Sequence, residues 1–88
     1  MDEKLEQKLE KYFTKAKPLF DKPQVSPEKD FDSKKAGNKI IEMALAYYND
    51  AQHFKEKGEY VNALAALEYA EGWLDAGRCT GLIKTKAP

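Results

Sequence analysis

The chain has 88 residues, 34% of them charged, and its 15 basic and 15 acidic side chains leave no net charge. One domain of this length buries a modest core, and the balanced charge argues against a dedicated electrostatic binder of nucleic acid. No apolar run approaches the roughly 18–20 residues of a membrane helix, and no signal peptide opens the chain. The one cysteine, Cys79, cannot form an internal disulfide, so we expect a cytoplasmic protein.

The first segment, "DEKLEQKLEKYFTKAKPLF", predicts a helix over about residues 2–20. Its apolar residues recur at spacings of four and three, which is typical of a packed helical seam. The seam comprises Leu5, Leu9, Tyr12, Ala16 and Leu19, with Phe13 and Phe20 beside it. Pro18 lacks a backbone donor, so the helix should end or kink there.

The next stretch, "DKPQVSPEKD", contains two prolines and predicts a loop. Within it, Ser26 followed by Pro27 and an acid has the pattern of a helix cap. A second helix is predicted over about residues 31–57, with Gly58 as its stop. Its shared apolar side comprises Ile40, Ile41, Ala44, Tyr47, Tyr48, Ala51 and Phe54. Gly37 and Asn38 should weaken its first turns.

A third helix is predicted over about residues 59–76, closed by Gly77, and is followed by a tail over residues 78–88. In that tail Leu82 and Ile83 could dock, whereas the basic end should be disordered. No segment alternates like a strand. We therefore predict one all-α domain, an antiparallel up-and-down three-helix bundle with short connections.

Charged residues form edges on two of these helices. A basic strip on the first helix comprises Lys4, Lys8, Lys11 and Lys15. Its other flank carries Asp2, Glu3, Glu6 and Glu10, and the third helix has an acidic edge of Glu68, Glu71 and Asp75. These could be solvated flanks, or the lysine edge could face the acidic edge and fix how the bundle closes. A strip that contacts phosphate is the third interpretation, although no arginine or aromatic residue interleaves the lysines.

The third helix is apolar nearly all round, although two neighbours can cover only one side of it. Its surplus side comprises Val61, Ala65, Ala66, Tyr69, Gly72, Trp73 and Ala76. In one interpretation the tail folds back and covers this side with Leu82 and Ile83. In the other it is a partner surface, either a homodimer contact or a site for an unidentified protein. A small-molecule groove beside Trp73 is a further alternative.

The stretch Ala44–Leu82 resembles the archaeal domain-of-unknown-function family numbered 357 through "YYNDAQHF", "KGEYVNALAALEYA" and "GWLDAG". The resemblance implies an archaeal origin and a compact three-helix bundle, and it carries over no activity and no catalytic residues. The part "FKEKGEYVNALAALEYA" is also similar to one tetratricopeptide hairpin, but no second copy exists in the chain, and such solenoids need several repeats.

Catalytic chemistry has little support in the sequence. Asp50 and His53 share one helical side, but a metal site needs three or four convergent ligands, and His53 belongs to the polar side. We therefore expect no catalytic, cofactor-binding or metal-binding residue, and predict a non-enzymatic module for protein interaction or self-association. The alternative is small-ligand or nucleic-acid binding through the lysine strip and the basic tail.

Overall fold

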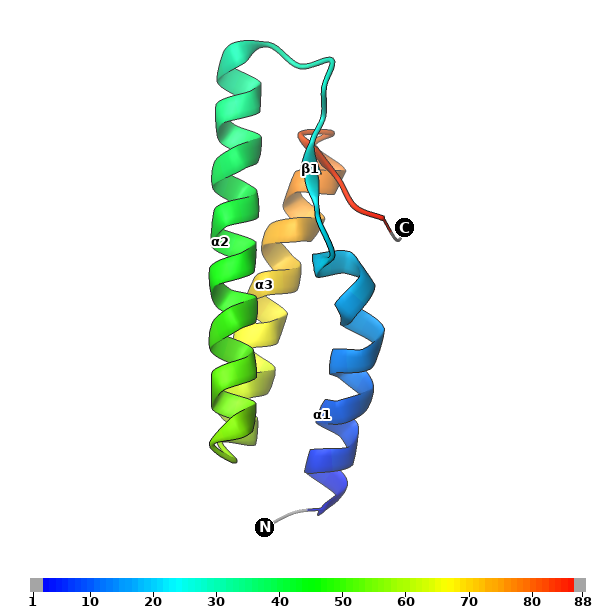
Figure 1. Ribbon diagram of the computed structural model, residues 1–88, viewed down its shortest axis with the longest axis vertical. Helices are drawn as coiled ribbons and strands as arrows, with labels where there is room; N and C mark the ends of the chain where they lie inside the picture. The colour runs from blue at the N-terminus through cyan, green and yellow to red at the C-terminus, as the bar shows by residue number, and fades with distance from the viewer. Residues whose placement is uncertain (1–2, 87–88) are drawn as a thin grey trace.

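The computed structural model describes residues 3–86, and its three helices run up, down and up along the long axis (Figure 1). They are α1 (Glu3–Ala16), α2 (Phe31–Glu56) and α3 (Tyr60–Cys79). This arrangement confirms the predicted all-α three-helix bundle, with dimensions of 49 × 19 × 17 Å. Asp2, predicted to lie in the first helix, and the last two tail residues are outside the described range.

The first α-helix ends near Pro18, as predicted. Ala16 is the last residue of α1, and a 3₁₀ helix, η1 (Lys17–Phe20), continues the chain with Pro18 in its first turn. The buried stripe of this segment differs from the predicted seam. It comprises Leu9, Phe13, Ala16 and Phe20. Tyr12, predicted in the seam, is 43% exposed because the helix turns its phenylalanines inward instead.

The second helix begins at Phe31, as predicted, but with a different cap. The Asp30 carboxylate accepts a hydrogen bond of 2.8 Å from the Ser33 backbone N–H, which satisfies one of the helix's unpaired donors. The prediction that Ser26 caps a helix is therefore wrong. Its side chain is buried, and its hydroxyl donates to the Gly81 carbonyl at 2.8 Å, tying the loop to the distant tail.

The helices α2 and α3 form an antiparallel hairpin. Gly58, at φ 79°, turns the chain between them, a conformation in which glycine carries no Cβ penalty. Much of the buried surface within this hairpin is alanine, which permits the two helices to approach closely. The buried alanines are Ala44 and Ala51 on α2, and Ala63, Ala66 and Ala70 on α3.

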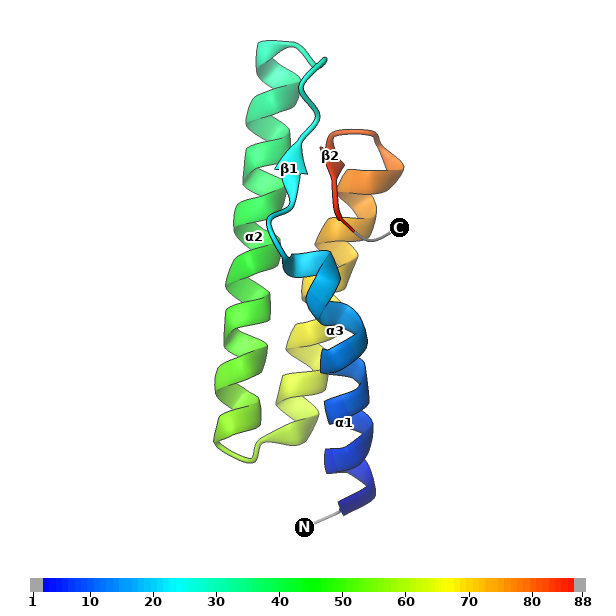
Figure 2. The same ribbon diagram turned by 45° about the vertical axis from the view of Figure 1, so that its right-hand side comes forward.

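The tail after α3 is ordered and pairs with the first loop. The two-residue strands β1 (Gln24–Val25) and β2 (Ile83–Lys84) are antiparallel, with Val25 opposite Ile83 (Figure 2). The expectation of a disordered basic end is wrong for residues 84–86, which the structure places beside the loop.

Gly77 does not end α3, contrary to the prediction. The helix continues to Cys79, and the chain turns at Gly81, which has a φ of 74°. Gly77 is instead buried against the tail: a Cβ built there would lie 2.7 Å from Ile83 Cγ1. Gly37, predicted to weaken α2, has a similar role, since its Cβ would lie 2.9 Å from the Leu82 carbonyl oxygen. Both glycines are therefore needed for close packing.

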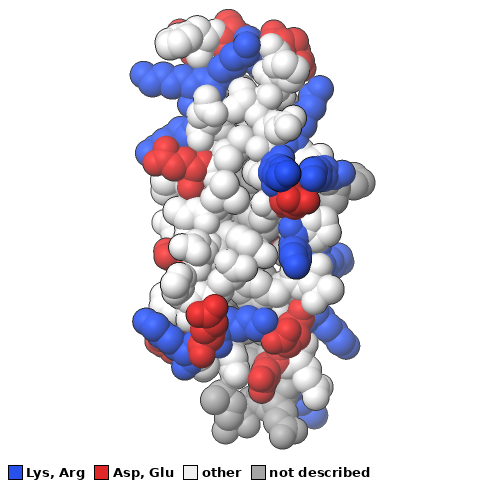
Figure 3. Space-filling model, viewed as in Figure 1, with Lys and Arg blue, Asp and Glu red and all other residues white. Residues whose placement is uncertain are grey.

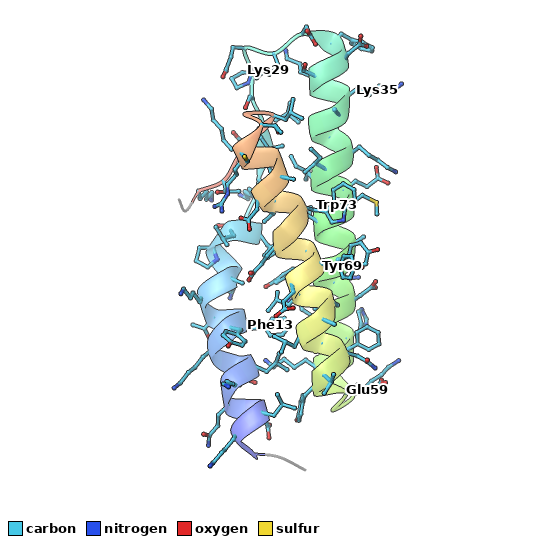
Figure 4. All side chains as sticks on the ribbon, turned by 180° about the vertical axis from the view of Figure 1, so that it is seen from behind. Phe13, Lys29, Lys35, Glu59, Tyr69 and Trp73 are labelled. Carbon is cyan, nitrogen blue, oxygen red and sulfur yellow. The ribbon has the colours of Figure 1, made fainter. Side chains whose placement is uncertain are left out.

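Different elements cover the two halves of α3. The helix α1 lies along its first half, and the β1–β2 pair lies beside its last turns (Figure 2). Seen from behind, α3 lies in front of the other elements along its length (Figure 4). Its outer side is therefore the part of the helix that no other element covers.

Candidate protein-interaction surface

A shallow groove of about 560 Å³ follows the outer side of α3. Its lining residues are Ala65, Glu68, Tyr69, Gly72, Trp73 and Ala76. Five of these belong to the surplus apolar side predicted from the sequence. The groove is open to solvent and carries one charged side chain, Glu68, at its edge.

Two aromatic side chains form the wall of the groove toward α2. Tyr69 and Trp73 both project from α3 toward α2 (Figure 4). The Tyr69 ring stacks on the Tyr47 ring of α2, with centroids 5.2 Å apart and planes at 19°. Tyr69 is nevertheless 64% exposed, whereas Trp73 is half-buried and packs against the core. The wall is thus held in place on one side and open to a ligand on the other.

The floor of the groove is made of very small residues. A Cβ built on Gly72 would meet no atom within 4 Å beyond its own local helix. Ala65 and Ala76, about two turns before and one turn after it, are both exposed. A partner backbone or side chain can therefore approach the α3 backbone closely at Gly72.

The edge of the groove away from α2 is acidic. Glu71 is half-buried there, and its burial, followed by the negative charges of Asp75 and Glu68, raises the pKa of its carboxyl group. Lys15 on α1 and Arg78 act in the opposite direction. Arg78 also binds Asp75 at 2.7 Å, whereas Glu68 has no ion-pair partner among residues 3–86.

Two residues of the predicted surface do not line the groove, and one residue that lines it was not predicted as part of the surface. Ala66 is 8% exposed and belongs to the core, because it faces α2 rather than solvent; its inclusion in the surface was wrong. Val61 is 70% exposed and lies beyond the end of the groove. Glu68 was absent from the prediction, although its position three residues after Ala65 and four before Gly72 placed it on the same side.

The described part of the tail, residues 78–86, does not cover this surface. Leu82 and Ile83 dock, but Ile83 packs against Gly77 and lies near Ile40, on the side of α3 that faces the core. The interpretation in which Leu82 and Ile83 make the Tyr69–Trp73 side part of the core is therefore wrong. Residues 3–86 leave the groove open.

The predicted lysine strip is exposed along α1 and does not join the groove. It comprises Lys4, Lys8, Lys11 and Lys15, of which Lys15 interacts with Glu71. That interaction agrees, at this one position, with a lysine edge facing an acidic edge. In the basic tail Lys86 pairs with Asp21 at 3.1 Å and Lys84 lies 4.0 Å from Glu28. On the face shown in Figure 3, blue and red side chains are interspersed rather than gathered by sign.

His53, the catalytic candidate weighed above, is an exposed side chain on α2. Within residues 3–86, no three His, Cys, Asp or Glu side chains are grouped so that they could hold a metal ion. None of the helices in that range combines the length and apolar character required to span a bilayer.

These features define a small all-helical bundle protein with an open apolar groove on its last helix. The family described as "Protein of unknown function (DUF357)" matches residues 3–83, and the chain belongs to this family. The match includes α1, which lay outside the resemblance seen in residues 44–82. No curated protein and no solved structure matches the chain.

Proposed function

We propose that this protein is a non-enzymatic interaction module, and that the groove on α3 is its contact surface for a protein partner or for a second copy. The observation that supports the proposal most directly is the exposure of Tyr69 over a floor that includes Gly72. Tyrosine and tryptophan are among the residues that most often supply the binding energy of protein interfaces, and a glycine beside them lets a partner approach closely. The module would act in the cytoplasm, consistent with its single, exposed cysteine.

The two forms of the proposal differ in what the purified protein does by itself. Self-association predicts that sedimentation velocity will show a mass that rises with concentration. Binding of another protein predicts a monomer whose Trp73 emission shifts when an apolar helical peptide is added. Trp73 is the only tryptophan in the chain, so the signal reports on this groove directly.

The variant Gly72→Leu tests the surface without disturbing the core. Its side chain would enter open space in the groove, and leucine is a better helix former than glycine. The control Gln7→Leu adds the same side chain at an exposed position on α1. We expect Gly72→Leu to reduce association or peptide binding at least about tenfold, while Gln7→Leu leaves it unchanged.

The proposal would be wrong if the wild-type protein stayed monomeric at all concentrations and Trp73 emission responded to no helical peptide of either charge. It would also be wrong if Gly72→Leu and Gln7→Leu had the same effect, because the contact would then lie elsewhere.

A further inference from the structure

We propose, building on the proposed function, that the occupant of the groove is an amphipathic helix of another protein, with lysine or arginine residues flanking its apolar stripe. Three features favour this occupant: the shape of the groove, the charge of its edge and the poor fit of an antiparallel two-fold pair of this chain.

The shape of the groove suits a helix. The lining of the groove extends along α3 from Ala65 to Ala76, which at about 1.5 Å per residue is about 17 Å, or three turns. Helices bind such grooves through side chains about one turn apart. The gap at Gly72 would admit one large apolar side chain of the partner, and the wall of Tyr69 and Trp73 would pack along the flank of that side chain.

The negative charge of the groove edge favours a partner with basic side chains. Glu68 lines the groove, and Glu71 and Asp75 lie on the same edge, close enough that both Glu68 and Asp75 act on the Glu71 carboxyl group. Among residues 3–86, Asp75 alone of these three has an ion pair, with Arg78. A docked helix with lysine or arginine opposite Glu68 would supply the missing counter-charge, while an acidic helix would be repelled.

A second copy of the chain that packs α3 antiparallel to the first fits this edge poorly. When two α3 helices pack antiparallel about a two-fold axis, each edge meets the same edge of the other copy. Because Glu68 lies four residues before Gly72 and Asp75 three residues after it, a pair centred on Gly72 would bring acidic edge against acidic edge. Like charges opposed across an interface disfavour it.

The test uses two synthetic helical peptides of about 15 residues, long enough to span the groove with about one further residue at each end. Both carry the same leucines at one face; one has lysine on its flanks and the other has glutamate at the same positions. Trp73 emission and calorimetry measure binding to the full chain. We expect the lysine peptide to bind at least about tenfold more tightly at low salt, and the preference to shrink as salt rises toward about 1 M.

Two charge variants locate the effect. Glu68→Lys should weaken binding of the lysine peptide roughly threefold or more and strengthen binding of the glutamate peptide. The control Glu42→Lys makes the same charge change on α2, outside the groove lining, and should leave the preference between the peptides in place.

Other outcomes would contradict the basic helix as occupant, the proposed interaction module, or both. Equal binding of the two peptides, or a preference for glutamate, removes the basic helix as occupant but leaves an interaction module. Self-association that Gly72→Leu abolishes and Gln7→Leu does not assigns the groove to a second copy and also removes the basic helix. Binding of neither peptide, together with a monomer at all concentrations, removes both this inference and the proposed function.

Discussion

Two glycines five residues apart on α3 occupy opposite environments. Gly77 lies under the tail, where a Cβ would be 2.7 Å from Ile83 Cγ1 and 3.0 Å from Ile40 Cγ2. Gly72 lies in the groove, where a Cβ would meet nothing within 4 Å beyond its own local helix. The first glycine is required by close packing inside the chain, whereas no contact made by the described residues requires the second. The comparison separates the part of α3 that the fold uses from the part that it leaves available.

The tail makes this difference. After Gly81 the chain turns back, so that Ile83 lies under the last turns of α3 and pairs with Val25 in the strand of the first loop. The tail as far as residue 86 therefore closes the core at one end of the bundle and does not reach the groove. Changes at the covered end should alter stability, and changes at the open side should alter binding.

Truncating the tail side chain that packs under α3 should have the largest effect on stability. Ile83 is 2% exposed, and Ile83→Ala leaves a cavity against Gly77 and Ile40. We expect the free energy of unfolding to fall by about 2–4 kcal/mol, measured by urea denaturation. The control Leu45→Ala, at a position 38% exposed on α2, should cost clearly less. Equal losses at the two positions would mean that the tail is not a component of the core.

The same substitution at both glycines gives the sharpest form of the comparison. Gly72→Ala and Gly77→Ala share the gain in helix propensity of about 1 kcal/mol, so it cancels in their difference. Overpacking at Gly77 should make Gly77→Ala less stable than Gly72→Ala by about 1–3 kcal/mol. Thermal and urea unfolding of both variants measure this difference. Stabilities within about 0.5 kcal/mol of each other would contradict the close contact with Ile83.

Much of the fold was predictable because the helices follow local rules. The period of the apolar residues, Pro18 and Gly58 placed three helices and two of their ends close to where the structure has them. The misplaced end at Gly77 shows the limit of such rules. A glycine near the end of an apolar helix can stop it or admit a neighbour, and only the position of Ile83, six residues later, decides between these roles.

The candidate surface was predictable in outline for the same reason. An excess of apolar residues around α3 indicated that the other two helices could not cover all of it, but the pattern could not say whether the tail or a partner covers the remainder. Ala66 was misassigned because its place at the boundary between the two sides depends on how α2 packs beside it. The role of Ser26 was also hidden, since its partner, Gly81, is distant in the chain.

Loss of that distant contact should have an intermediate effect. Ser26 is 1% exposed, and its hydroxyl donates to the Gly81 carbonyl oxygen. Ser26→Ala leaves this acceptor without the side-chain donor, so we expect a loss of about 1–2 kcal/mol in the free energy of unfolding. The control is Thr14→Ala, which removes an exposed hydroxyl that donates to the Glu10 carbonyl one turn earlier in the same helix. A loss no greater than in this control would show that the hydroxyl does not help to hold the tail.

The smallest expected effect concerns the two edges of α3 and depends on pH. Burial raises the pKa of Glu71 above its ordinary value of 4.5, so the folded state holds this proton more tightly than the unfolded state. The stability linked to the proton is fully present below about pH 4.5 and is lost as pH rises through the raised pKa. Glu71→Gln removes the ionisation, so the variant should exceed the wild type in stability at pH 7 and lose that advantage below pH 4.5.

Urea denaturation at a series of pH values measures this advantage, and Glu68→Gln separates its causes. Burial is the largest cause of the shift in the Glu71 pKa, and the charge of Glu68 ranks below both burial and Asp75. In a Glu68→Gln background, the gain from Glu71→Gln at pH 7 should therefore shrink but persist. Its complete disappearance would mean that repulsion along the acidic edge, rather than burial, controls this carboxyl group, and Glu68 would then contribute more to the charge of the groove edge than its rank among the causes indicates.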